Sequence, residues 1–284
     1  MDDELRNTRD DRSPAPVVVG VDDTTHAREA VGWGAVEAAR LGAPLRLVAA
    51  SGLVGEHLPG RTGRDRRLHE VLAAARAAAV EAGAAAVTTA VRSGYPAEVL
   101  ADESRTARLV VVGDRGASRF EGALAGSVAV SLLGRAECPV VVVRGRPLGT
   151  TRAPAGLPVV VGLDGTPAAD AALEVALELA AARGADLVVL HCAEQPVGGP
   201  AVDRLVAARA AGRGVLVRVV SGAGHPDDLL LAEARRAQLV VVGSRGRGDL
   251  AGLLLGSVSA ALVHGADCPV VVVGPRARRP VPAG

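Results

Sequence analysis

The stretch VVVGDRGASRFEGALAGSVA, residues 110–129, returns later in the chain as VVVGSRGRGDLAGLLLGSVS, residues 240–259. Both copies place Gly-x-x-Gly directly after a run of valines, and both place Gly-Ser after nine further residues. A short valine run that ends in glycine is typical of a buried parallel strand followed by a turn. The two stretches therefore predict the same strand, loop and helix twice in one chain.

The repeat extends over nearly the whole sequence. PVVVGVDDT at residues 16–24 returns as PVVVGLDGT at residues 158–166, and CPVVVV occurs once in each half. Each half has the length of an ordinary domain that can bury its own core. Between the copies, GRPLGTTRAPAG has the proline, glycine and threonine content of a linker.

We therefore expect two domains that are joined by a linker and flanked by disordered tails. Asp22 and Asp164 are 142 residues apart, whereas Gly113 and Gly243 are 130 apart, so the first copy holds 12 additional residues. They are expected around GEHLPGRTGRD. The expected boundaries are residues 1–14 for the N-terminal tail, 15–144 for the first domain, 145–156 for the linker, 157–275 for the second domain and 276–284 for the C-terminal tail.

Short valine-rich runs alternate with longer segments of helical periodicity, which predicts parallel strands covered by helices on both faces. A helix is expected at 167–185, with Thr166 as its N-cap and Gly184 at its end, and further helices should open at Pro96 and Pro226. The expected fold is α/β, with two tandem doubly wound domains of the Rossmann-like type, each built on a five-stranded parallel sheet. In the second copy the expected strands are 159–163, 187–192, 215–220, 239–243 and 270–273.

Composition excludes several function classes. A net charge of +1 with interspersed signs gives no reason to expect a nucleic-acid or membrane partner, and no apolar stretch suits a membrane span. The sequence has no lysine, so a Walker A loop, a protein kinase site and Schiff-base chemistry are excluded. The three cysteines and six histidines lack the spacing of a zinc site. We expect a cytoplasmic protein whose nucleotide site, if it has one, uses backbone amides and arginine.

The repeated loop has the features of a phosphate cradle at the carboxyl end of a strand. The glycines after the valine run should let the backbone turn sharply and approach an anion. Gly-Ser should open the next helix, where free amides and a hydroxyl favour phosphate. A simple strand-exit turn and helix cap is the alternative. The positions concerned are Gly113, Gly116, Gly126 and Ser127 in the first copy, and Gly243, Gly246, Gly256 and Ser257 in the second.

With these motifs the sequence resembles the universal stress protein family in its tandem two-domain form, from about residue 16 to 274. The resemblance rests on G-x2-G-x9-G-[S/T] in both copies, on the aspartate that closes the first strand, and on the Cys-Pro-Val last strand. It implies a regulatory protein of stress adaptation that binds ATP, with Mg²⁺, and whose nucleotide state alters contacts with an unidentified protein partner. It also implies an internal pseudo-dimer through the last strands, with a homodimer as a further option.

The resemblance also implies which residues line the nucleotide sites. The aspartate that closes the first strand would lie in the nucleotide pocket, and the residue at the end of the second strand would line the adenine pocket. The arginine between the first two glycines would contact ribose and phosphates, and the residues around Gly-Ser would receive the triphosphate. Besides the glycines and serines above, these positions are Asp22, Ala50, Val112, Arg115 and Val128 in the first copy, and Asp164, Cys192, Val242, Arg245, Val258 and Ser259 in the second.

The two sites are not identical in sequence, and alternatives remain open for their function. Additional carboxylates in the first copy should repel a triphosphate, so the second site is expected to be the tighter. The aspartates after the first strands could instead cap the following helices. An enzyme that slowly hydrolyses ATP or transfers phosphate, and a structural protein with an empty pocket, are the other functions. The first copy has Asp23, Asp114 and Ala129 where the second has Gly165, Ser244 and Ser259.

Overall fold

The computed structural model describes residues 14–52, 61–115, 127–144, 156–192, 199–246 and 255–277. The expected tails and linker lie outside these residues, except for positions 14, 156, 276 and 277. Gly116 and Gly126 also lie outside them, as does the side chain of Cys192. The expected domain boundaries therefore stay predictions.

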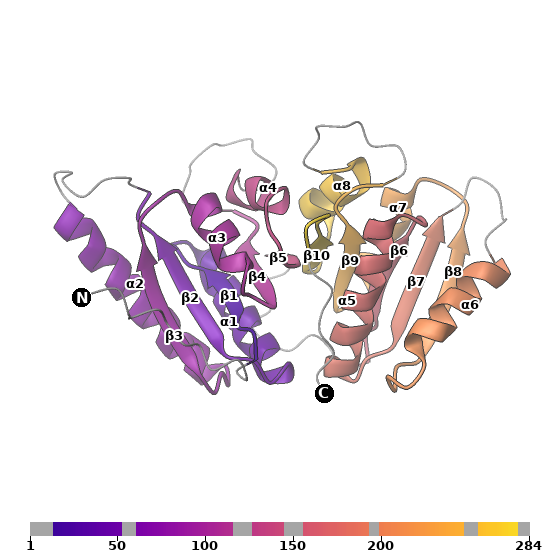
Figure 1. Ribbon diagram of the computed structural model, residues 1–284, viewed down its shortest axis with the longest axis horizontal. Coiled ribbons are helices and arrows are strands. Elements are labelled where there is room, and N and C mark those ends of the chain that lie inside the picture. Colours follow the sequence, from indigo (N-terminus) through magenta and orange to yellow (C-terminus); the bar gives the residue numbers. More distant parts are fainter. Residues whose placement is uncertain are drawn as a thin grey trace, which may run out of the picture.

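One ten-stranded sheet runs through the molecule, in the order β3-β2-β1-β4-β5-β10-β9-β6-β7-β8 (Figure 1). Neighbouring strands are parallel within each half of the sheet. The predicted doubly wound α/β fold is thus confirmed. The strands are β1 (Val17–Gly20), β2 (Leu45–Ala50), β3 (Val87–Arg92), β4 (Leu109–Gly113), β5 (Val140–Val143), β6 (Val159–Leu163), β7 (Leu187–Cys192), β8 (Val217–Gly222), β9 (Leu239–Gly243) and β10 (Val270–Val273).

The two halves meet at the centre of the sheet. There β5 and β10 pair antiparallel, with Val141 opposite Val271. The expected contact between the last strands of the two copies is therefore confirmed. Antiparallel pairing of equivalent strands is the arrangement of an internal pseudo-dimer, because each copy presents the same edge to the other.

Four of the five strands predicted for the second copy have the predicted bounds, whereas β8 is shifted by two residues, to Val217–Gly222. The register explains the shift, because β7 begins at Leu187 and pairs there with Val217. Gly214 has a φ of 67°, a left-handed turn conformation, and Leu216 after it is exposed. The apolar residues 215–216 therefore belong to the connecting segment that precedes β8.

Helices cover both faces of the sheet. The core residues of α1, α2, α5 and α6 belong to one hydrophobic cluster, and those of α3, α4, α7 and α8 to another. Within β1, Val17 and Val19 belong to the first cluster and Val18 to the second, which is why the strand is valine throughout. The helices are α1 (Thr25–Arg40), α2 (Arg61–Glu81), α3 (Pro96–Ser104), α4 (Ser127–Leu133), α5 (Pro167–Arg183), α6 (Gly199–Ala210), α7 (Pro226–Ala234) and α8 (Ser257–Gly265).

The ends of α5 follow the sequence signals. The side chain of Thr166 accepts a hydrogen bond from the Ala169 amide at 3.3 Å, and Pro167 is the first helical residue. Gly184 follows the helix in a left-handed conformation, with φ 58° and ψ 37°. The predicted cap and start of this helix are therefore confirmed, and Gly184 is its C-cap, so α5 ends two residues before the expected position 185.

The additional residues of the first copy lengthen a helix. The length of α2 is 21 residues and that of α6 is 12, so nine of the 12 additional residues extend α2. The long helix lies at the outer edge of the first half (Figure 1). The first copy therefore has two and a half helical turns that α6 lacks.

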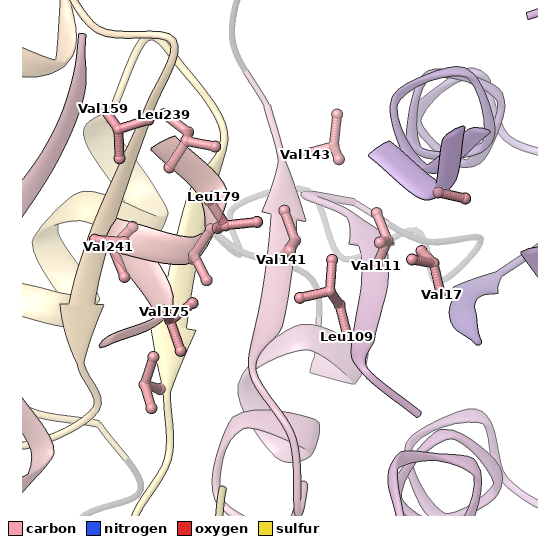
Figure 2. Packing of buried hydrophobic residues seen from close by; sticks show 14 of the residues in the cluster. Val17, Leu109, Val111, Val141, Val143, Val159, Val175, Leu179, Leu239 and Val241 are labelled. Atoms are coloured by element: carbon pink, nitrogen blue, oxygen red, sulfur yellow. The ribbon is translucent and has the colours of Figure 1, made fainter. Parts of the chain in front are cut away.

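A hydrophobic cluster and a buried ion pair join the two halves. The cluster of the α1 and α5 face is continuous across the centre, and Figure 2 shows members from both halves, among them Val141 and Leu179. Arg183 of α5 lies 2.5 Å from Glu37 of α1, and their side chains are 2% and 0% exposed. The Arg183 guanidinium also lies 5.5 Å from the centre of the Trp33 ring. Burial raises the pKa of Glu37 even though two arginines act against the shift.

Candidate functional site

A cavity of about 610 Å³ lies at the carboxyl ends of β1, β2 and β4 in the first half. Since β1 pairs with β2 on one side and with β4 on the other, the strand order reverses at this point. Ligands of doubly wound sheets bind at such a reversal. The volume lies within the range of small-molecule sites.

The cavity gathers the site residues that were predicted for the first copy and that the structure describes. They come from the ends of three strands and from the start of α4, and they span more than 100 residues of sequence. Their convergence follows from the parallel sheet, which brings the carboxyl ends of its strands to one edge. The residues are Asp22, Ala50, Val112, Gly113, Arg115, Ser127 and Val128.

The second copy places its candidate residues at the same edge of its own half. Asp164 directly follows β6, Cys192 ends β7, and Gly243 ends β9 after Val242. Ser257 is the first residue of α8, and Gly256 is its N-cap, as predicted for the Gly-Ser pair. The remaining positions, Arg245, Gly246 and Val258, lie in the segments that connect or begin these elements.

Two helices form walls of the cavity that the motifs did not predict. One wall comes from α2 and the other from α3, and both are mainly apolar. Their helical periodicity was visible in the sequence, but the phase of a helix relative to a distant strand end was not. The missed lining residues of these walls are Arg67, Leu68, Val71, Pro96, Val99 and Leu100.

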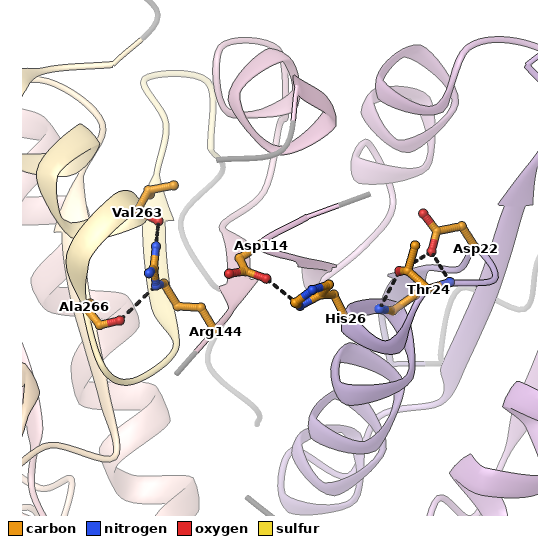
Figure 3. A network of polar contacts seen from close by, with 8 residues as sticks. Asp22, Thr24, His26, Asp114, Arg144, Val263 and Ala266 are labelled. Carbon is orange, nitrogen blue, oxygen red and sulfur yellow. Dashed lines mark hydrogen bonds and ion pairs between the residues drawn. The ribbon is translucent and has the colours of Figure 1, made fainter. Parts of the chain in front are cut away.

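Asp22 both lines the cavity and fixes the start of α1 (Figure 3). Its Oδ1 accepts hydrogen bonds from the Thr24 amide at 3.0 Å and from the Thr24 hydroxyl at 2.5 Å. The Thr24 hydroxyl in turn accepts from the Ala27 amide at 3.1 Å. Asp164 repeats the arrangement with Thr166. The helix cap is therefore the threonine, and the aspartate orients the cap from the cavity side.

The first glycine of each motif allows a helix to pack against a strand end. A Cβ on Gly113 would lie 2.8 Å from the carbonyl carbon and oxygen of His26, and one on Gly243 would lie 3.0 Å from the carbonyl carbon of Ala168. Contacts under 3.0 Å do not occur, so the start of α1 would have to move. Neither glycine is among the residues with positive φ. Close packing of α1 and α5 therefore accounts for these two glycines, and the chain bends directly after each of them.

The carboxylates that distinguish the first site each face a basic side chain. An Asp114 oxygen lies 2.9 Å from Nδ1 of His26 (Figure 3). An Asp23 oxygen lies 2.5 Å from Arg67 of α2. The Arg67 guanidinium therefore opposes the repulsion of a triphosphate that was expected from Asp23, and Asp114 has a polar partner in the His26 ring.

Ser259, which the resemblance places among the residues that would receive the triphosphate, makes contacts within the protein. The residue is 2% exposed, and its hydroxyl donates to the carbonyl oxygens of Ser244 and Gly256, both at 3.0 Å. The Gly256 amide also donates to the Ser244 carbonyl, at 2.8 Å. These bonds join the end of β9 to the start of α8.

Arg144, which directly follows β5, connects the first half to the second. Its Nε donates to the Ala266 carbonyl at 2.8 Å, and the guanidinium also donates to the Val263 carbonyl (Figure 3). These carbonyls belong to the end of α8, where a cation is favourable. Burial lowers the Arg144 pKa, and the nearby Asp114 acts in the opposite direction.

The described residues contain neither a metal-binding cluster nor a membrane-spanning helix. Within those residues, histidine, cysteine, aspartate and glutamate side chains form no group of three or more that could hold a metal ion. No helix in the same part of the chain is long and apolar enough to cross a membrane.

Comparisons with known proteins identify the family. The sequence profile described as Universal stress protein family matches residues 15–144, 157–205 and 199–274. A universal stress protein of Mycolicibacterium smegmatis is 37% identical over 92% of this chain and 97% of its own, and one of Mycobacterium tuberculosis is 36% identical over 90% and 95%. The crystal structure of a universal stress protein from Archaeoglobus fulgidus shares the fold, with a TM-score of 0.76, 22% identity, and coverage of 92% of this chain and 98% of that one. This chain therefore belongs to the universal stress protein family.

Proposed function

We propose that the protein binds an adenine nucleotide, specifically ATP with Mg²⁺, in the cavity of the first half and at the equivalent edge of the second. Its role would be regulatory, in stress adaptation in the cytoplasm, with the nucleotide state altering contacts with a protein partner. One observation carries the proposal. One cavity of nucleotide-compatible size brings together the seven described residues of the first copy that the motif and the family resemblance assign to the nucleotide site.

The chemistry of the cavity walls suits the parts of a nucleotide. Near β2 and α3 the lining is apolar, with Val48, Val99 and Leu100, and can accept the flat face of a base. Arg115 and Ser127 lie on the side of β4 and α4, where a guanidinium and a hydroxyl can bind phosphate oxygens. Mg²⁺ would be held mainly by phosphate oxygens and water, which is the usual mode when few protein carboxylates are available.

A binding role is favoured over rapid turnover. Phosphoryl transfer requires a positioned base, a metal held by protein carboxylates and a cation on the transferred group. The sequence offers no lysine, and the described residues offer no metal-binding cluster. We expect ATP turnover well below the rates of about 1–100 s⁻¹ of kinases. Phosphate release at kinase-like rates would favour the enzymatic alternative.

The proposal can be tested by identifying the natural ligand and then blocking the cavity. The protein is purified without added nucleotide and denatured, and the released small molecules are identified by mass spectrometry. Mg-ATP binding is then measured by calorimetry on Ala50→Phe, which places a ring inside the cavity, and on Ala85→Phe, at an exposed bend outside it. Ala50→Phe should abolish binding at one site, and Ala85→Phe should bind as the wild type does. Unaltered binding by both variants would show that the cavity is not the site.

A further inference from the structure

The outer wall of the cavity carries an ion pair at its mouth. Arg67 of α2 and Asp23 of the segment after β1 both line the cavity, and their charged atoms lie 2.5 Å apart. The Arg67 side chain is 71% exposed and that of Asp23 is 43% exposed. An ion pair in contact with solvent contributes little free energy, so a stronger anionic partner can displace the carboxylate.

Arg67 gives the cavity a second cation besides Arg115, and the two arginines lie on different walls. Arg115 follows β4, whereas Arg67 lies on α2, beside Leu68 and Val71 of the same wall. The carboxylates among the lining residues are Asp22 and Asp23, and Asp22 already accepts two hydrogen bonds from Thr24. A guanidinium offers several donors to an oxyanion, so the pair of arginines can hold a ligand that carries several negative charges.

The second copy has no equivalent of Arg67. Arg67 lies 20 residues before the first residue of β3, and the position 20 residues before β8 is residue 197, which precedes α6. In the sequence, the segment between Cys192 and Arg204 is AEQPVGGPAVD, which contains no basic residue. The helical extension of the first copy therefore brings to its site a cation that this segment of the second copy cannot supply.

We propose that Arg67 is a ligand-binding residue of the first site. When the nucleotide binds, the Arg67 side chain leaves Asp23 and binds an anionic group of the nucleotide. The first site then discriminates by phosphate charge more strongly than the second. This inference rests on the proposed nucleotide-binding function and adds a specificity residue to it. It also reverses the order of affinity that was expected from the number of carboxylates alone.

The test compares ligands that share a base and differ in charge. Adenosine, AMP and Mg-ATP are titrated by calorimetry into the full chain, its Arg67→Gln and Arg67→Lys variants, and Arg66→Gln. Arg66 is the exposed neighbour on α2 that does not line the cavity, so it is the matched control. Arg67→Gln should weaken one of the two Mg-ATP binding events about tenfold, because one hydrogen bond to a charged group is lost. The same variant should weaken adenosine binding less than about twofold. Arg67→Lys should recover part of the loss, and Arg66→Gln should bind all three ligands as the wild type does.

Asp23→Asn provides an independent arm. Removing the competing carboxylate should tighten Mg-ATP binding at the same site by about two- to fivefold, as expected for loss of an exposed ion pair. The proposal is overturned if Arg67→Gln weakens adenosine and Mg-ATP equally, because Arg67 would then only shape the wall. It is also overturned if Arg67→Gln changes nothing, or if Asp23→Asn weakens Mg-ATP binding, because the ion pair would then persist in the complex. A wild-type protein that binds none of the three ligands would instead refute the proposed function itself.

Discussion

The ion pair between Glu37 and Arg183 should be the most sensitive point of the contact between the two halves. We predict that Arg183→Met lowers the free energy of unfolding by about 3–5 kcal/mol, the cost of removing one partner of a buried pair. The side chains are 2% and 0% exposed, so water cannot replace the missing guanidinium. The nearest remaining cation is Arg40, whose nitrogen lies 3.6 Å from the Glu37 carboxylate.

A second variant separates the pair from its surroundings. Methionine preserves much of the apolar volume of Arg183 against Trp33, so the loss should come from the buried carboxylate, which then has only the more distant Arg40 as a cationic partner. The double variant Arg183→Met, Glu37→Leu removes that carboxylate as well. Its stability should return to within about 1–2 kcal/mol of the wild type, because well-packed apolar residues often replace a buried ion pair at little cost.

The sequence supplies a local probe for this measurement. Trp33 is the only tryptophan and lies 5.5 Å from the Arg183 guanidinium, so its fluorescence reports on the contact directly. Urea unfolding is followed by Trp33 fluorescence and by circular dichroism. The control is Arg235→Met, whose ion pair with Asp267 is 76% and 64% exposed and should be worth no more than about 1 kcal/mol. The reasoning is refuted if Arg183→Met costs no more than this control, or if the double variant is as unstable as the single one.

Three further outcomes follow from individual residues. Gly113→Ala should destabilise the protein by about 1–3 kcal/mol, because its Cβ would lie 2.8 Å from the His26 backbone. The control is Gly63→Ala, whose Cβ would have no atom within 4 Å and which should be neutral or stabilising. Thermal melts measure both variants. Burial raises the pKa of Glu37 above its usual value of 4.5. The stability of the wild type relative to Glu37→Gln should therefore be greatest below about pH 4.5 and should fall as the pH rises through the raised pKa. A pH-independent difference between the two proteins in urea unfolding would contradict this. Burial raises the pKa of Cys138 and of Cys268 to about 12, so iodoacetamide at pH 8 should modify both thiols only after unfolding, as read by peptide mass spectrometry.

The fold could be predicted from the sequence because its signals are local and repeated. Unbroken valine runs mark strands that are buried on both faces, and Thr166, Pro167 and Gly184 mark the ends of one helix. The boundary of β8 was wrong because it depends on the register with β7, which apolar residues alone do not encode. Local chemistry therefore predicted the elements, and pairing between strands corrected one of them.

The candidate site could be predicted only in part. Residues at strand ends, such as Asp22 and Arg115, could be assigned because parallel strands bring their carboxyl ends together. The position of Arg67 could not, because it depends on how α2 is rotated against the sheet. The contact between Glu37 and Arg183 joins residues 146 positions apart, and no sequence pattern near either residue predicts it.

The edges of the sheet explain why the two copies form one folded unit. Each half of the sheet would end in β5 or β10. Each of these strands consists of four buried valines, and the two strands pair with each other at the centre of the whole sheet. The outer strands are different, since β3 reads VTTAVR and β8 reads VRVVSG, with exposed polar residues in both. Polar residues protect a free strand edge from unwanted pairing, whereas an uncovered valine edge would associate with other chains. Each half therefore requires the other, and the two proposed nucleotide sites have to be measured in the full chain.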